Sequence, residues 1–88
     1  MSCEIKRLVS GHDCVLFVYG RIDRDDVHTL REVIGQEKGG RVVIDLAEVT
    51  LVHREAIRLL AFSEANGIEL RNSPTYMHEW VARAKNVA

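Results

Sequence analysis

The segment Arg41–Leu60, RVVIDLAEVTLVHREAIRLL, constrains the fold more than any other part of the chain. It starts with the β-branched run VVI at positions 42–44, followed by Asp45. A continuous apolar run of this kind predicts a strand covered on both faces, as in a parallel sheet. After a short loop a helix is predicted to begin near His53, because apolar residues return at helical spacing at Ala56, Ile57, Leu60 and Ala61. A strand that leads into a helix N-terminus, with its free N–H groups and partial positive charge, is a frequent functional position in α/β proteins.

The residue pattern of the N-terminal third predicts a β-hairpin followed by a helix. Apolar runs at 3–9 and 14–19 flank Ser10-Gly11-His12-Asp13, a sequence that favours a turn. Gly20-Arg21-Ile22-Asp23 then ends the second strand, and Asp23 is suited to N-cap the helix. Lys38-Gly39-Gly40 is a strong helix stop, and the apolar stripe of this helix is Val27, Leu30, Val33 and Ile34.

The C-terminal part predicts a short strand and a last helix. Asn66-Gly67 ends the central helix, and residues 68–71 form a fourth strand. Ser73 and Pro74 indicate an N-cap and a first helical position. The apolar stripe Met77, Trp80, Val81 and Ala84 predicts that Met77 and Trp80 lie in the core, whereas Tyr76 falls off the stripe and is a better surface candidate.

The predicted order ββαβαβα gives an α/β fold in a single small domain, residues 1–88. Three strands separated by two helices imply two right-handed crossovers, so the four-stranded sheet is mixed and mostly parallel, and helices pack on it. A chain of 88 residues has room for one core only.

Composition excludes several classes of partner. The chain has 12 basic and 13 acidic residues, a net charge of −1, which gives no overall basic field for nucleic acid or anionic lipid. No apolar run approaches the roughly 18 residues of a membrane span, and the N-terminus has no signal-peptide pattern. We therefore expect a cytoplasmic protein without membrane insertion, monomeric or weakly dimeric, and no cofactor.

The cysteines and the acidic cluster are given structural interpretations. In the predicted hairpin Cys14 lies opposite Val9 and Cys3 opposite Gly20, too far apart for a disulfide, so free reduced thiols are expected. The chain has no CxxC pair and no histidine spacing typical of metal ligands. The aspartates at 23, 25 and 26 are explained by helix capping rather than by a metal.

At this point the sequence resembles the STAS domain, the domain of bacterial anti-sigma factor antagonists and of sulfate-transporter tails. The resemblance rests on the order of elements, the step Gly20–Asp23, Asp45-Leu46 at the strand end, Gly67–Leu70, and Ser73-Pro74. It covers roughly residues 5–86. It implies an α/β fold and a regulatory function through protein binding.

The chain departs from the family where the family's chemistry lies. Members typically have Asp-Ser-Ser-Gly at the helix start, and in the antagonists the resemblance implies that a serine there is phosphorylated by a cognate kinase. This chain has His53-Arg54-Glu55-Ala56, with Arg54 in the phosphoacceptor position. Arginine has no hydroxyl, which excludes a phosphoserine switch at this position. The nearest hydroxyls belong to Thr50 on the loop and Ser63 well into the helix.

Three interpretations of residues 53–55 remain open. In the first, they are surface residues at a helix start, where Glu55 interacts favourably with the helix dipole. In the second, they form a constitutive interaction surface, in which Glu55 imitates a phosphate charge or Arg54 pairs with an acidic partner. In the third, Arg54, His53 and the helix N–H groups form an anion or nucleotide site. Asp45 likewise either caps the following turn or has a functional role.

The sequence therefore favours a non-catalytic protein–protein interaction domain similar to an anti-sigma factor antagonist, in a partner-switching system, without the serine switch. The expected partner is a kinase-like or anti-sigma protein, and the expected surface comprises Asp23, Glu48, Thr50, His53, Arg54, Glu55 and Arg58. The alternative is a module that binds a nucleotide, lipid or anion at the N-terminus of the second helix. A low-activity enzyme that uses His53 and Glu55 as base and acid is a third hypothesis.

Overall fold

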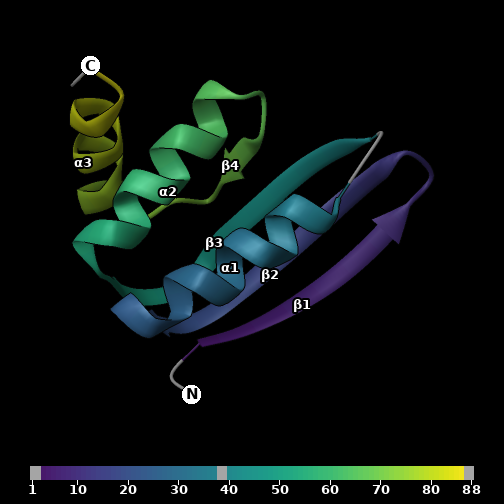
Figure 1. Ribbon diagram of the computed structural model, residues 1–88, viewed down its shortest axis with the longest axis horizontal. Helices are drawn as coiled ribbons and strands as arrows, with labels where there is room; N and C mark the ends of the chain where they lie inside the picture. The colour runs from purple at the N-terminus through teal and green to yellow at the C-terminus, as the bar shows by residue number, and fades with distance from the viewer. Residues whose placement is uncertain (1–2, 38–39, 87–88) are drawn as a thin grey trace.

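The computed structural model describes residues 3–37 and 40–86, and the side chains among them as far as Ala84. The predicted α/β fold and the order ββαβαβα are confirmed (Figure 1). The stop signal at Lys38-Gly39 lies outside the described residues. The elements are β1 (Cys3–Ser10), β2 (Asp13–Ile22), α1 (Arg24–Gln36), β3 (Arg41–Val52), α2 (Arg54–Ala65), β4 (Glu69–Arg71) and α3 (Thr75–Asn86).

The sheet is mixed and mostly parallel, as predicted. Its strand order is β1-β2-β3-β4, in which β1 and β2 are antiparallel and the other neighbours are parallel. The hairpin register places Cys3 opposite Gly20 and Cys14 opposite Val9, as expected, and both cysteines are free and buried. Burial, with smaller contributions from nearby aspartates, raises the pKa of the Cys3 thiol to about 11.

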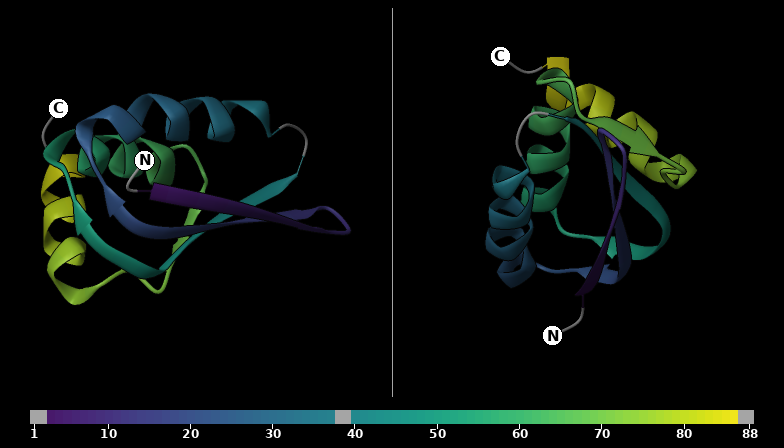
Figure 2. Two further views of the ribbon diagram at one scale, coloured as in Figure 1. Left: turned by 90° about the horizontal axis from the view of Figure 1, so that it is seen from below. Right: turned by 90° about the vertical axis from the view of Figure 1, so that its right-hand side faces the viewer.

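The main core lies between one face of the sheet and the helices. Leu16 of β2, Leu30 of α1 and Leu60 of α2 are fully buried in it, together with Met77 of α3. Figure 2 shows α1 and α2 side by side over the same face of the sheet, with α3 next to α2. Within the described ranges, no helix has both the length and the apolar character that a membrane crossing requires.

Strand β3 is longer than predicted. A loop was expected between Asp45-Leu46 at the strand end and His53, and the chain instead continues as a strand to Val52. Irregular pairing with β2 makes this possible, since β3 has extra residues between the partners of Phe17 and Tyr19 and again before Leu51. At the first irregularity Asp45 accepts a hydrogen bond from the backbone N–H of Ala47 (3.0 Å). Its other carboxylate oxygen accepts one from the Asn72 amide (3.1 Å). Asp45 therefore has the structural role that the sequence left open.

Helix α3 corrects a second prediction. It begins at Thr75, one residue after the position expected from Pro74. Met77 is buried, as predicted, but Trp80 is not a core residue, since 54% of it is exposed. The inward stripe comprises Met77, Val81 and the partly buried Ala84, and Trp80 lies at its edge. The helix thereby presents a large aromatic side chain to solvent.

Candidate functional site

The predicted site lies where two neighbouring parallel strands end. The last residues of β2 and β3, Ile22 and Val52, are paired, and the backbone N–H of His53 donates to the carbonyl of Ile22 (2.8 Å). The turn that contains Asp23 and the first residue of α2 are therefore held at the same edge of the sheet. This edge is the usual place for sites in sheets with parallel strands.

His53 caps α2 with its side chain. Its Nδ1 atom accepts a hydrogen bond from the backbone N–H of Glu55 (3.1 Å), which satisfies one of the free donors at the helix end. The side chain of Arg54, the first residue of α2, is exposed and forms no hydrogen bond or ion pair within the described part of the chain. Glu55 is exposed in the first turn, where its charge complements the helix dipole, and lies 3.8 Å from the guanidinium of Arg58. Of these three residues, Arg54 is therefore the one whose charged side chain has no partner in the described part of the chain.

Asp23 is held by its own helix. It forms a reciprocal capping box with Asp26, whose carboxylate accepts the backbone N–H of Asp23 (2.8 Å). Its carboxylate also pairs with Arg21 at 3.0 Å. These contacts give Asp23 a structural role at the start of α1 and bring Arg24 toward the start of α2.

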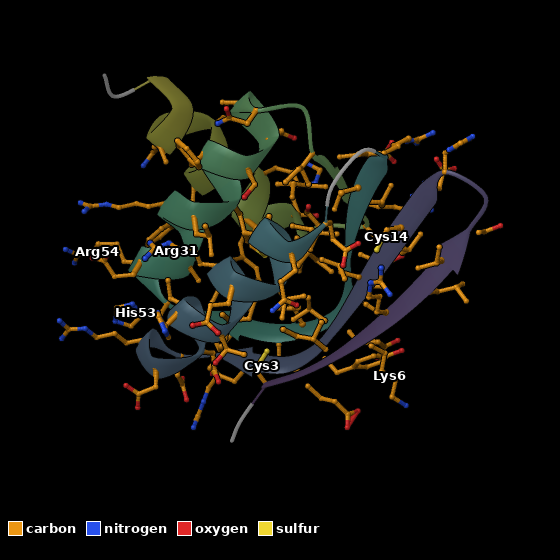
Figure 3. All side chains as sticks on the ribbon, turned by 45° about the vertical axis from the view of Figure 1, so that its right-hand side comes forward. Cys3, Lys6, Cys14, Arg31, His53 and Arg54 are labelled. Carbon is orange, nitrogen blue, oxygen red and sulfur yellow. The ribbon has the colours of Figure 1, made fainter. Side chains whose placement is uncertain are left out.

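Three helices contribute to one exposed hollow at this edge, with a volume of about 550 Å³. Figure 3 shows His53 and Arg54 at the same end of the molecule, far from Cys14. The hollow combines an indole with two guanidinium groups, an imidazole and a carboxylate; its lining residues are Arg24, His53, Arg54, Glu55 and Trp80.

The two predicted residues of β3 are placed differently. Thr50 is exposed, and its carbonyl accepts a hydrogen bond from the Tyr76 hydroxyl (3.2 Å), so the second irregularity of β3 is joined to α3. Glu48 is also exposed, but it precedes the strand end by four residues, which separates it by up to about 13 Å from Val52. The structure therefore groups His53, Arg54 and Glu55 with Arg24 and Trp80, and leaves Glu48 apart from them.

Neither Arg24 nor Trp80 belongs to the surface that the sequence predicts. A signal for Trp80 was present, because Tyr76 and Trp80 are four residues apart and therefore share a helix face next to the Met77–Val81 stripe. Both aromatic side chains are exposed, Tyr76 at 45%. Arg24 carried no signal, since its proximity to α2 arises from the pairing of β2 with β3.

The remaining titratable pairs lie outside this site. Hydrogen bonds from Arg41 lower the pKa of Glu69, and hydrogen bonds from Arg7 lower that of Glu37. Among the described side chains, no three histidine, cysteine or acidic residues gather as metal ligands do.

Comparisons with known proteins support the fold. No family model matches the chain, and neither does any curated protein. Among solved structures, the crystal structure of an antisigma-factor antagonist, a STAS domain from Rhodobacter sphaeroides, is similar with a TM-score of 0.62 and 20% identity. The match covers 78% of this chain and 83% of that chain. At this identity the likeness shows the fold alone, and the predicted STAS-like fold is confirmed.

Proposed function

We propose that this domain acts by binding another protein through the start of α2, in the manner of an anti-sigma factor antagonist, without catalysis and without a serine switch. The observation that carries the proposal is the exposed hollow in which Trp80 lies beside Arg54 and Glu55. Tryptophan and arginine are the residues most enriched where protein interfaces concentrate their binding energy. The STAS fold of the antisigma-factor antagonist supports the same class of function.

We further propose that binding here is not controlled by phosphorylation at the helix start. Arg54 occupies the phosphoacceptor position and has no hydroxyl. Ser63 is buried, and its hydroxyl donates to the carbonyl of Leu59 (2.8 Å), so a kinase would have to unfold α2 to reach it. The partner's affinity would then be set by fixed charges, and the expected partner is a kinase-like or anti-sigma protein of the cytoplasm.

The proposal is tested by affinity capture from the native cytoplasm. Wild type is compared with Trp80→Ala and with the double reversal Arg54→Glu, Glu55→Arg. The matched control is Leu8→Ala, because Leu8 on β1 is exposed to the same extent as Trp80, 55% against 54%. We expect one kinase-like or sigma-related protein to be captured by wild type and by Leu8→Ala and lost from both site variants. Equal capture by all four proteins would show that the start of α2 is not the interface.

A second candidate function is the binding of a small anion in the same hollow. It is favoured by the arrangement of Arg24 and Arg54 around an exposed indole, which suits a negatively charged group attached to a flat ring. A ligand at 100 times its dissociation constant adds about 2.7 kcal/mol to the free energy of unfolding. The absence of a thermal shift with millimolar phosphate and with a panel of nucleotides would remove this candidate.

A further inference from the structure

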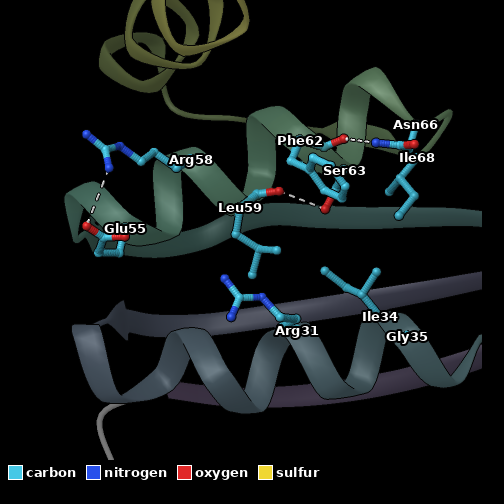
Figure 4. A pocket seen from close by; sticks show the side chains of 10 residues that line it. All are labelled: Arg31, Ile34, Gly35, Glu55, Arg58, Leu59, Phe62, Ser63, Asn66 and Ile68. Carbon is cyan, nitrogen blue, oxygen red and sulfur yellow. Dashed lines mark hydrogen bonds and ion pairs between the residues drawn. The ribbon is translucent and has the colours of Figure 1, made fainter. Parts of the chain in front are cut away.

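A second, more apolar hollow lies between α1 and α2. It is a groove of about 660 Å³ whose apolar lining is formed by Ile34, Leu59, Phe62 and Ile68. In Figure 4, Arg31 and Ile34 point from α1 toward α2, and Leu59 points from α2 toward α1. Phe62 is 68% exposed, more than any other large apolar side chain of the described residues. The groove therefore offers an exposed aromatic ring next to partly buried apolar side chains of both helices and of the segment after α2.

The charges beside the groove are predominantly positive. Arg31 on α1 forms no ion pair within the described part of the chain. Arg58 on α2 has only the loose contact with Glu55. The side chains of Arg31 and Arg58 are both exposed. The charged residues that line this groove and the adjoining hollow are Arg24, Arg31, Arg54, Arg58 and Glu55. The groove itself is lined by two arginines and one glutamate, and the adjoining hollow adds two more arginines. The face is complementary to an acidic partner.

Gly35 keeps the groove open. It lies within α1, where glycine is less favourable than alanine, yet a Cβ atom at this position would meet nothing within 4 Å. Packing within the described part of the chain therefore does not require a glycine here. The missing side chain leaves room for a group that comes from outside the chain.

We propose that the groove between α1 and α2 binds an acidic amphipathic helix of another protein. Apolar side chains on one face of that helix pack on Leu59, Ile34 and Phe62, and its flanking carboxylates pair with Arg31 and Arg58. The lining residues of α2 and its C-cap run from Glu55 to Asn66, which spans about 16 Å, or about three helical turns. Helix-in-groove binding uses anchors at this kind of spacing.

The distribution of charge favours a helix over a fatty acyl chain. An acyl chain has one carboxylate at its end, whereas here arginines from both helices border the groove. The exposed ring of Phe62 also leaves one side of the groove open to solvent. The proposal does not depend on the proposed function, because the two arginines that would pair with the helix, Arg31 and Arg58, line the groove and not the hollow at Trp80.

The test uses two designed, fluorescein-labelled 14-residue helical peptides. Both carry leucine at positions i, i+4 and i+7 on an alanine background; one has glutamate at the flanking positions and the other has lysine. Binding to the full chain is measured by fluorescence polarisation for wild type, Gly35→Leu, Gln36→Leu and Trp80→Ala. Gly35→Leu fills the groove, while Gln36→Leu adds the same side chain at the next helix position, about 100° away around α1.

We expect the acidic peptide to bind wild type, Gln36→Leu and Trp80→Ala within twofold of one another, and Gly35→Leu at least tenfold more weakly. The basic peptide is expected to bind wild type at least tenfold more weakly than the acidic one. A melting temperature of Gly35→Leu at or above that of wild type shows that the variant folds. Retained binding by Gly35→Leu, equal binding of the two peptides, or no binding of the acidic peptide would overturn the proposal.

Two further outcomes assign the groove to another occupant and also overturn it. Sodium laurate that binds wild type but not Gly35→Leu, with no binding of the acidic peptide, assigns the groove to an amphiphile. A dimer seen by analytical ultracentrifugation and abolished by Gly35→Leu assigns it to a second copy of the chain. The Trp80→Ala variant separates the two proposed sites. Loss of peptide binding in Gly35→Leu but not in Trp80→Ala assigns the peptide to the groove rather than to the start of α2.

Discussion

Replacement of glycine by alanine is expected to have opposite effects at Gly35 and Gly40. At Gly35 the new methyl group meets nothing within 4 Å, so the change removes backbone entropy from the unfolded chain at no steric cost. Glycine inside a helix is less favourable than alanine by about 0.5–1 kcal/mol. For a domain of this size that gain raises the melting temperature by about 2–8 °C.

At Gly40 the same methyl group would overlap the backbone carbonyl of His12, the oxygen that accepts the N–H of Arg41 (3.0 Å). A backbone atom cannot move away as a flexible side chain can, so the hairpin turn or the start of β3 must shift. Forced overlaps of this kind cost about 1–3 kcal/mol. Gly40→Ala is therefore expected to lower the melting temperature by at least about 4 °C.

The free energy of unfolding is measured by urea titration followed by far-ultraviolet circular dichroism, with the slope of the transition checked to be unchanged. Gly67→Ala serves as a control, because Gly67 has φ +93° with free space around it and so reports backbone strain alone. A neutral or destabilising Gly35→Ala would refute the reasoning. It would mean that the space above Gly35 is filled in solution and that the groove between α1 and α2 is closed.

The remaining predictions concern buried or paired polar groups. Asp45→Ala is expected to lower the free energy of unfolding by about 2–3 kcal/mol in urea titrations, because it leaves two hydrogen-bond donors unpaired; a loss below about 0.5 kcal/mol would contradict this role. Since hydrogen bonds from Arg41 lower the pKa of Glu69, its contribution to stability is present above the ordinary carboxyl pKa and is lost as the pH falls through the lowered value. The difference in urea midpoint between wild type and Glu69→Gln is therefore expected at pH 7 and should shrink as the pH falls through the lowered pKa of Glu69; a difference that does not change with pH would have another cause. Because burial raises the pKa of Cys3 to about 11, a thiol reagent at pH 8 should modify Cys3 rapidly only in urea, and rapid modification of the native protein would contradict its burial.

Local sequence signals determined most of the fold. The glycine and aspartate between the first two apolar runs predicted the hairpin register residue by residue, because both strands are regular. The extent of β3 could not be predicted in the same way. Asp45, Glu48 and Thr50 interrupt its apolar pattern, and irregular pairing with β2, which a sequence does not display, keeps the chain extended.

The residues that line the candidate site were predicted only in part, for reasons that lie in tertiary structure. The start of α2 could be proposed as a candidate site because the strand-to-helix transition is a local pattern. The contributions of Arg24 and Trp80 depend on how α1 and α3 pack beside α2. The apolar stripe predicts that Trp80 is buried, whereas Met77, Val81 and Ala84 of the same stripe pack on the core and Trp80 does not. A residue at the edge of an apolar stripe can face either way, and only the packing decides.

The capping role of His53 determines the hydrogen-bonding character of the helix start. Because Nδ1 accepts the N–H of Glu55, a neutral imidazole at His53 carries its proton on Nε2. Arg54 beside it offers donors only. A phosphorylated serine at the position of Arg54 would instead present three strong acceptor oxygens. If a protein docks at His53 and Arg54 as proposed, it would pair with these donors through acceptors, such as carboxylates or helix C-terminal carbonyls, whereas a protein that binds phosphoserine would supply donors.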